Sequence, residues 1–202
     1  MLPERIKNNY SIFTYIKLIY FVIRSKLISR RIRIIRFPIE IRGKKWINFG
    51  TNLTTGYWCR LEAFKLGTDS HGQISFGHNV QLNDFVHISS IRSVKIGNNV
   101  LIASHVYISD NSHGSYKGDE RDSLPDTPPS SREYNIAPVS IGNNVWIGEG
   151  VIIMCGVTIG DGCVIGAHSV VNRSIPENCI AVGSPVRIVK RFNNHTKHWE
   201  KV

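Results

Sequence analysis

A six-residue repeat between residues 141 and 171 constrains the fold of this chain more than any other feature. An aliphatic residue returns at every sixth position, and the fifth position of each repeat is Val, Cys or Ser. A period of six fits neither a helix nor a simple alternating strand, but it fits one short strand followed by one tight corner. The pattern therefore predicts a parallel β-helix, in which three repeats close a triangular coil. The first and fifth residues of each repeat should point inward, starting with Ile141, Ile147, Ile153, Ile159, Ile165 and Val171.

Weaker repeats of the same length occupy the preceding part of the chain and extend the predicted solenoid back to about Trp46. Gly and Asn at the second to fourth positions supply the corners, because they tolerate positive φ, and β-branched residues suit the short strands. The register slips by two residues near Val94. The repeats begin at Phe49, Thr55, Leu61, Phe76, Leu82, Ile88, Ile96, Ile102 and Ile108.

The repeat is interrupted between residues 111 and 138. This stretch is polar and contains four prolines, at positions 125, 128, 129 and 138. A loop of this length inside a regular solenoid is more often functional than accidental. We therefore expect an extruded loop that contributes to a binding or catalytic site.

The repeat, together with the ending VGSPVRIVKRF at residues 182–192, resembles the hexapeptide-repeat acyltransferases. The segments RIIRFPIEIR, VQLNDFVHIS, SDNSHG and PPSSREYNIAPVSIGNNVWIGE resemble, more narrowly, bacterial lipopolysaccharide or O-antigen biosynthesis O-acetyltransferases, and the similarity covers most of the chain. The resemblance implies a mainly β fold, a left-handed parallel β-helix, assembled as a homotrimer. It also implies acetyl-CoA as the acetyl donor and a sugar as the acceptor.

His113 lies at the start of the extruded loop. Counting in sixes from Ile108, it takes an outward position and Ser112 an inward one. In the family that the chain resembles, a histidine at this point acts as general base, so the resemblance implies that role for His113. A sugar hydroxyl attacks a thioester effectively only as its proton is removed, and a neutral imidazole accepts protons near neutral pH.

His87 is the main rival for this role, because it also falls at an outward sixth position, counted from Leu82. The other histidines lie at predicted corners or in the polar tail, and we assign them no chemistry. The γ-class carbonic anhydrases share this solenoid but need a second histidine five residues after the first, where this chain has Gly118. We therefore expect no metal.

Asn83 matches an asparagine that contacts the acceptor sugar in related galactoside acetyltransferases. Those relatives carry an acid eight residues further on, where this chain has Ile91. Asp84, or the pair Ser89 and Ser90, could take the place of that acid. The resemblance thus implies Asn83 as an acceptor-binding residue, and we add Asp84 as the candidate replacement for the missing acid.

Coenzyme A lies, in this family, in the groove between adjacent subunits. Glu149 departs from the family, where Ser or Gly is common at this position. The basic residues of the matching set suit the phosphates of coenzyme A. Carried across position by position, the cofactor-binding residues are Glu149, Ala167, Asn172, Arg173, Arg187 and Lys190, and we add Trp146 as a nearby outward aromatic residue.

The N-terminal segment carries the net charge of the protein. The whole chain has a formal charge of +10, and residues 1–45 hold 12 Lys and Arg against two Glu, so the remainder is neutral. Residues 4–28 read as a helix whose apolar run, 10–23, is too short and too interrupted for a membrane span of about 20 residues. Two uses stay open: docking onto the end of the solenoid, and contact with an anionic membrane surface. No nucleic-acid-binding motif accompanies the charge, so we expect no nucleic acid partner.

The four cysteines, at positions 59, 155, 163 and 179, form no CxxC pair, and no secretory signal precedes them. We therefore expect a reduced cytoplasmic protein, either free or peripheral at the inner face of the membrane. The chain divides into a basic helical and extended segment, 1–45, a β-helix domain, 46–192, and a polar tail, 193–202. From Phe192 the tail is expected to form a short helix.

These patterns together predict an O-acetyltransferase that transfers acetyl from acetyl-CoA to a sugar hydroxyl of a bacterial surface polysaccharide or its precursor. Two alternatives stay open. One is an acetyltransferase for another small acceptor, such as an amino sugar, an antibiotic or serine. The other is a non-catalytic β-solenoid that serves as a scaffold.

Overall fold

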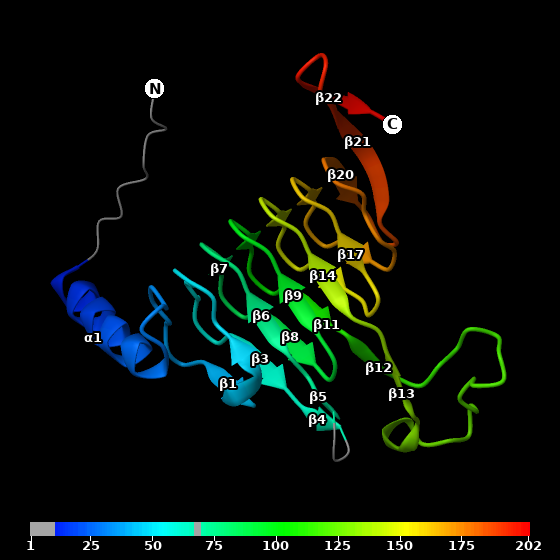
Figure 1. Ribbon diagram of the computed structural model, residues 1–202, viewed down its shortest axis with the longest axis horizontal. Coiled ribbons are helices and arrows are strands. Elements are labelled where there is room, and N and C mark those ends of the chain that lie inside the picture. Colours follow the sequence, from blue (N-terminus) through cyan, green and yellow to red (C-terminus); the bar gives the residue numbers. More distant parts are fainter. Residues whose placement is uncertain (1–10, 67–69) are drawn as a thin grey trace.

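The structure is a computed structural model that describes residues 11–66 and 70–202. One helix is followed by a left-handed parallel β-helix, with an extruded loop on one side and a hairpin at the C-terminal end (Figure 1). Both the mainly β fold class and the solenoid predicted from the six-residue repeat are confirmed.

Three parallel sheets form the faces of a triangular prism. The first face contains β1 (Glu40–Arg42), β3 (Arg60–Ala63), β8 (His87–Ser90), β11 (Tyr107–Ser109), β16 (Ile152–Ile153) and β19 (Val170–Val171). The second contains β2 (Ile47–Asn48), β6 (Ile74–Phe76), β9 (Val94–Ile96), β14 (Val139–Ile141) and β17 (Thr158–Ile159). The third begins with β7 (Gln81–Leu82), β10 (Leu101–Ile102), β15 (Trp146–Ile147), β18 (Val164–Ile165) and β20 (Cys179–Val182). Each coil passes from the second face to the third and then to the first.

The core is a stack of aliphatic side chains inside the prism. The strand register aligns equivalent residues of successive coils, so Ile108 of β11 pairs with Ile88 on one side and Ile153 on the other. These residues are fully buried, as are the fifth residues of the repeats, such as Val151. The inward positions predicted from the repeat are therefore confirmed, and the outward positions of the same strands remain free to form a surface.

The corners use the backbone conformation predicted for Gly and Asn. The fourth residue of each late repeat has positive φ, which is 56° at Asn144 and 66° at Gly150. Side-chain amides stack along one edge, where Asn99 donates to Asn144 Oδ1 at 3.2 Å. Gly148, at a second position, has no room for a side chain, because a Cβ would lie 2.6 Å from the backbone nitrogen of Ala167.

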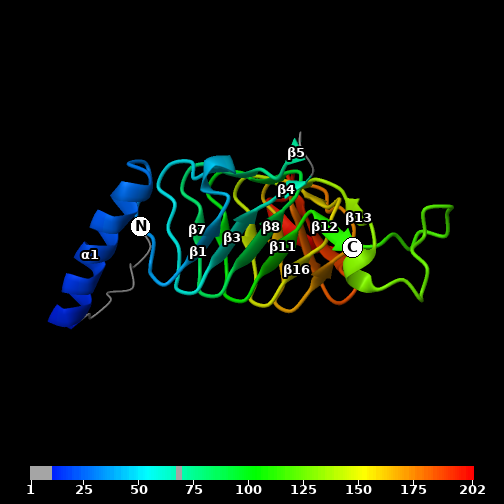
Figure 2. The ribbon, with the colours of Figure 1, turned by 90° about the horizontal axis from the view of Figure 1, so that it is seen from below.

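Both insertions of the solenoid leave from the same edge, between the first and second faces, which we call the loop edge. The first is the antiparallel pair β4 (Lys65–Leu66) and β5 (Ser70–His71). The second is the extruded loop, which holds β12 (Asn111–His113), the 3-10 helix η2 (Pro129–Ser131) and β13 (Tyr134–Ile136). Figure 2 shows the β4–β5 pair at the upper side of the solenoid and the extruded loop reaching out to the right, beyond β12 and β13.

The N-terminal helix α1 (Ile12–Ile28) covers the open end of the solenoid, and the part of its prediction before residue 11 lies outside the described residues. Ser25 ties it down, since its hydroxyl donates to the carbonyl of Phe21 at 2.6 Å and accepts the backbone N–H of Ile35 at 2.7 Å. The solenoid begins before Trp46, its predicted start, because β1 already pairs with β3. Trp46 itself ends the 3-10 helix η1 (Lys44–Trp46). Docking of the helix on the solenoid end is thus present in the structure.

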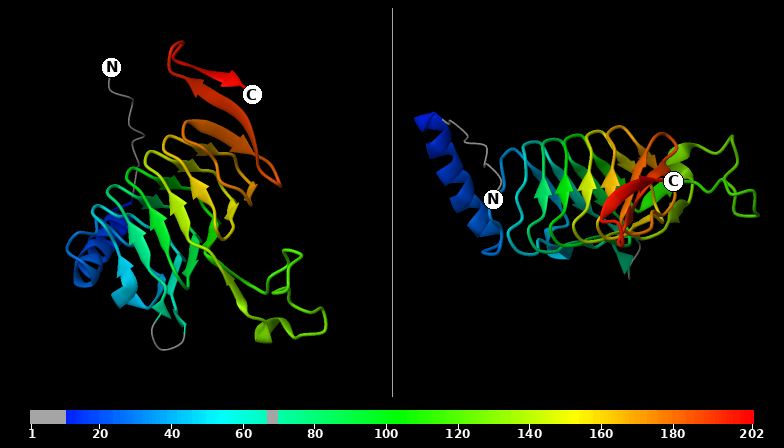
Figure 3. Two further views of the ribbon diagram at one scale, coloured as in Figure 1. Left: turned by 45° about the vertical axis from the view of Figure 1, so that its right-hand side comes forward. Right: turned by 90° about the horizontal axis from the view of Figure 1, so that it is seen from above.

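The C-terminal tail is a β-hairpin, so the expectation of a short helix from Phe192 is wrong. Strand β21 (Arg187–Asn193) pairs antiparallel with β20 and with β22 (His198–Lys201) (Figure 3). The segment alternates between exposed and half-buried residues, a period of two that suits a strand. The rings of Phe192 and Trp199 pack edge to face with centroids 5.3 Å apart, which holds the hairpin together.

Candidate active site

A buried carboxylate marks the point where the chain leaves the solenoid. Asp110 follows β11 and is fully buried. Its oxygens accept the backbone N–H groups of Ile91, Arg92 and Ser93 at 2.6–2.8 Å, and the hydroxyl of Ser90 at 2.9 Å. Asp110 therefore ties the exit of the extruded loop to the corner of the preceding coil.

His113 is held by a short antiparallel ribbon rather than by a coil. It lies at the end of β12 and pairs with Tyr134 of β13, and the two rings lie 4.7 Å apart at an angle of 43°. The ring of His113 is exposed, as the sequence predicted. The inward position predicted for Ser112 is wrong, because the six-residue register ends at Asp110 and Ser112 is half-buried in the ribbon.

The backbone of His113 is fixed by side chains from the far part of the loop. The hydroxyl of Tyr116 donates to the carbonyl of His113 at 3.0 Å, and Arg132 donates to that hydroxyl at 2.6 Å. Arg132 also donates to two loop carbonyls, those of Thr127 and Pro125. The loop thus forms a folded unit around the histidine.

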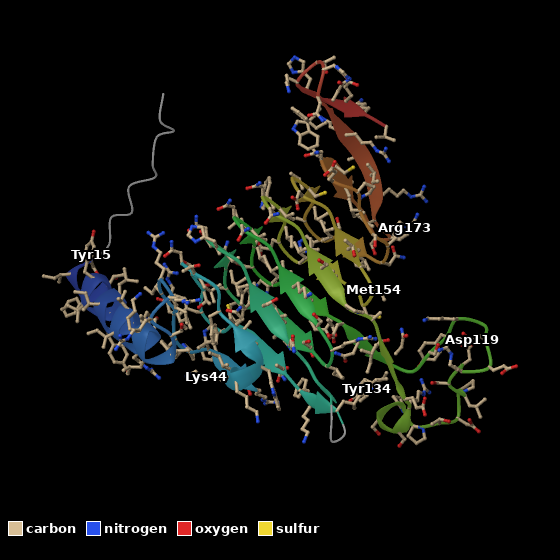
Figure 4. All side chains as sticks on the ribbon, viewed as in Figure 1. Tyr15, Lys44, Asp119, Tyr134, Met154 and Arg173 are labelled. Carbon is tan, nitrogen blue, oxygen red and sulfur yellow. The ribbon has the colours of Figure 1, made fainter. Side chains whose placement is uncertain are left out.

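A pocket of about 710 Å³ opens beside His113 along the loop edge and the outer surface of the first face. Its volume lies within the range of small-molecule sites. Its lining combines the ribbon residues His113 and Tyr134 with Ser89, Tyr107 and Met154 from successive strands and corners. Figure 4 shows Tyr134, Met154 and Arg173 following one another along this side of the molecule.

The rival base His87 is engaged beside this pocket. Its Nε2 lies 2.9 Å from Oε2 of Glu62, a carboxylate that is only 2% exposed. Burial raises the pKa of Glu62, but hydrogen bonds from Arg60 and His87 outweigh burial and leave the pKa below its ordinary value. The His87 ring also packs against Tyr107, with centroids 5.1 Å apart. His87 is therefore part of a charged cluster on the first face, and His113 is the histidine that lines the pocket.

The predicted acceptor residues lie on a different edge from His113. Asn83 and Asp84 follow β7 at the corner between the third and first faces, which we call the second edge. Asp84 Oδ1 accepts the backbone N–H of Tyr57 at 2.7 Å, so this carboxylate ties two coils together. Within one chain the structure does not bring Asn83 and Asp84 together with His113.

The predicted coenzyme A residues are divided in the same way. Glu149 and Ala167 lie on the second edge, while Asn172 and Arg173 follow β19 on the loop edge, one coil beyond Met154. These four residues are exposed. The other three predicted residues are Trp146, exposed on the third face, and Arg187 and Lys190, both on β21.

Several residues of the pocket were not predicted from the sequence. Tyr134 and Met154 belong to this group, and so does Cys155, whose sulfur lies 3.5 Å from the side-chain nitrogen of Asn135. The repeat pattern places Cys155 at a corner, but it contains no signal for the ribbon that brings residues 111–113 against residues 134–136. In residues 11–66 and 70–202 no cluster of three or more His, Cys, Asp or Glu could hold a metal ion.

Comparison with known proteins identifies the family. The family model for the bacterial transferase hexapeptide, which comprises six repeats, matches residues 138–173. The chain is 46% identical over 197 residues, 98% of its own length and 98% of the relative, to WbbJ of Escherichia coli (strain K12), named as a lipopolysaccharide biosynthesis O-acetyl transferase.

A second relative is the galactoside O-acetyltransferase of Escherichia coli (strain K12), which is 38% identical over 136 residues. That match covers 67% of this chain and 61% of the relative. A solved structure of a galactoside acetyltransferase in complex with coenzyme A superposes with a TM-score of 0.53 at 31% identity. It covers 89% of this chain and 76% of that chain.

The fold and the pocket define a left-handed β-helix acyltransferase. The chain belongs to the bacterial hexapeptide-repeat transferases and, within them, to the O-acetyltransferases that include WbbJ. The family resemblance stated from the sequence is thereby confirmed.

Proposed function

We propose that the protein transfers an acetyl group from acetyl-CoA to a sugar hydroxyl of a bacterial surface polysaccharide or its precursor. The observation that carries this proposal is the exposed imidazole of His113, held by the ribbon at the side of a pocket that follows the loop edge. The names of WbbJ and of the galactoside O-acetyltransferase support a sugar acceptor, and the coenzyme A complex of the solved relative supports the donor.

His113 is the proposed general base of a direct transfer. One imidazole nitrogen accepts the proton of the sugar hydroxyl as its oxygen attacks the thioester carbonyl carbon. When the tetrahedral intermediate collapses, the carbon–sulfur bond breaks and the imidazolium returns the proton to the departing thiolate. The contacts of Tyr134 with the ring and of Tyr116 with the backbone carbonyl fix the direction of the imidazole before the acceptor arrives.

The loop edge beyond His113 suits coenzyme A. Met154 presents an apolar side chain that is 43% exposed, one coil before Asn172 and Arg173. Arg173 makes no ion pair with any of the described residues, so its guanidinium is available to a phosphate group. Acetyl-CoA bound along this edge would place its thioester beside His113.

The division of the predicted residues between two edges supports a homotrimer. If the second edge of one subunit faces the loop edge of the next, Asn83 and Glu149 of one chain join His113 and Arg173 of its neighbour. Mixing inactive His113→Ala and Asn83→Ala proteins under conditions that exchange subunits should then restore part of the activity. Absence of any recovery in mixed oligomers would contradict a shared site.

The proposed reaction can be tested by incubating the protein with acetyl-CoA and a panel of sugars, amino sugars and serine. Mass spectrometry should show a gain of one acetyl group on a sugar hydroxyl, and this gain should be lost in His113→Ala. Acetylation of an amine or of serine alone would favour the alternative acceptors. Calorimetric absence of coenzyme A binding would favour a non-catalytic scaffold.

A second surface supports contact with an anionic membrane. Helix α1 buries Phe21 against the solenoid, but most of its other large apolar side chains are exposed, including Phe13 at 80% and Leu27 at 80%. Arg24 and the arginines at positions 30, 31 and 33 follow on the same end of the molecule. No helix within the described residues is long and apolar enough to cross a membrane. We propose that α1 lies on the surface of the cytoplasmic membrane.

This proposal predicts that the protein sediments with vesicles containing phosphatidylglycerol and is released by deletion of residues 1–28. Replacing Phe13 and Leu27 by Ser should weaken binding while leaving the docked Phe21 in place. Equal sedimentation of the intact and shortened proteins would show that the helix serves docking alone.

A further inference from the structure

The pocket beside His113 continues well past the histidine toward the N-terminal coils. Its lining includes Phe64 and Lys65, which end the first coil on the loop edge, and Tyr107 of the third coil. Adjacent parallel strands lie about 4.8 Å apart, so β3 and β11, which are separated only by β8, lie roughly 10 Å apart. The proposed coenzyme A edge runs in the opposite direction, toward Arg173. The N-terminal arm of the pocket is therefore left for the acceptor, and it is longer than a single pyranose ring.

Ser89 contributes a hydroxyl to the lining of this arm. It lines the pocket and is only 8% exposed, yet its hydroxyl bonds to none of the described residues. Its neighbours differ: Ser90 donates to Gln73 and Asp110, and Ser109 donates to the carbonyl of Asn111. A hydroxyl that lines a pocket and has no protein partner is available to a ligand. A ligand hydroxyl that reached Ser89 would form a hydrogen bond with it.

Tyr107 lies on β11, the strand next to the one that carries Ser89, and offers an aromatic surface. Its ring is 38% exposed, and it packs on His87, which Glu62 holds from the preceding strand. Glu62 pairs with Ser89 in the register of β3 and β8, so the charged cluster borders the same arm. An apolar ring surface next to a hydroxyl matches the chemistry of a sugar, which presents C–H groups on one face and hydroxyls at its rim.

We propose that this arm binds a second sugar ring of the acceptor, so that the substrate is a glycoside of at least two linked rings. The ring that is acetylated lies at His113, and the next ring lies over Tyr107 with a hydroxyl bonded to Ser89. The proposal rests on the proposed function and deepens it, because it assigns the size of the acceptor. It also explains an arm of the pocket that a free monosaccharide would leave empty.

The test compares acceptors that differ in length. Methyl glycosides of galactose, glucose, mannose and rhamnose are offered with acetyl-CoA. Each sugar is also offered in two disaccharides, one with a glucose attached to it and one in which it is itself attached to methyl glucoside. For the sugar that is acetylated, one extended form should have a kcat/KM about tenfold above that of the single ring. Ser89→Ala should reduce this advantage by roughly five- to tenfold, the effect of one hydrogen bond. Ser89→Thr, which keeps the hydroxyl, should retain it.

Ser140→Ala is the matched control, because Ser140 is a half-buried serine on the second face, remote from the pocket. It should leave the ratio of the two kcat/KM values unchanged. Equal kcat/KM for single and extended acceptors, or an unchanged ratio in Ser89→Ala, would overturn the second subsite while acetylation itself upheld the proposed function. If no sugar is acetylated in either form, the proposed function fails, and the second subsite fails with it.

Discussion

Asp110 provides the sharpest stability test of the structure, because one side chain organises the exit of the extruded loop. Replacing Asp110 by Ala removes the acceptor for three backbone N–H groups and for the hydroxyl of Ser90. Arg92 is exposed and Ser93 is half-buried, so water can replace the carboxylate at their N–H groups. Ile91 is buried, so its N–H would be left without a partner, whereas the hydroxyl of Ser90 keeps its bond to the carbonyl of Gln73.

The expected loss comes mainly from the N–H of Ile91. An unsatisfied buried donor costs about 1–3 kcal/mol, and the lost bonds at the other positions add to this, so Asp110→Ala should lower the free energy of unfolding by about 2–4 kcal/mol. Asp110→Asn keeps the shape of the side chain, but its NH₂ group cannot accept a hydrogen bond, so at least one backbone N–H loses its acceptor. We expect it to cost about 1–3 kcal/mol.

Urea unfolding at one fixed protein concentration would measure both losses, since oligomers unfold in a concentration-dependent way. Asp161→Ala is the control, because Asp161 is an exposed corner carboxylate that accepts two hydrogen bonds from Asn143. That variant should lose about 1 kcal/mol or less. A loss for Asp110→Ala no larger than that for Asp161→Ala would refute the role assigned to the buried carboxylate.

Three further predictions concern single side chains. The pKa of Glu62 is below its ordinary value of 4.5, so ionised Glu62 stabilises the fold at neutral pH. This stabilisation is lost as the pH falls below about 4.5. The difference in the free energy of unfolding between wild type and Glu62→Gln should therefore be smaller at pH 3 than at pH 7. Burial raises the pKa of the Cys59 thiol to about 11, whereas Cys155 is half-buried and lines the pocket. A thiol reagent at pH 8 should therefore label Cys155 before Cys59. In Cys155→Ser the fast phase of thiol labelling should be absent. Arg173→Ala should raise KM for acetyl-CoA by about tenfold with little change in kcat, and an unchanged KM in steady-state assays would remove Arg173 from the donor site.

The solenoid could be predicted from the sequence because each six-residue repeat shows the same residue types at the same positions. Aliphatic residues at the first position, such as Ile147 and Ile153, are buried in the core, and Gly or Asn at the corners has positive φ. The polar composition of the tail does not predict the C-terminal hairpin. The alternation across β21 is a period-two signal that was present in the sequence.

The candidate site was predictable at His113 but not in its surroundings. The interruption of the repeat marks the loop, and family resemblance picks out the histidine. The contact of His113 with Tyr134 arises from an antiparallel ribbon across more than 20 residues, and no short-range pattern encodes that pairing. The same is true of the Glu62 and His87 pair, which forms because the strands β3 and β8 of successive coils are adjacent in the first face.

The proposed chemistry depends most directly on the imidazole of His113. The decisive measurement is kcat for acetyl transfer by His113→Ala, with His78→Ala as a control, because His78 is an exposed corner histidine away from the pocket. His113→Ala should keep the oligomer and coenzyme A binding but lose activity by roughly 10²–10⁴, the contribution of a general base, while His78→Ala stays near wild type. Full activity in His113→Ala would contradict the mechanism.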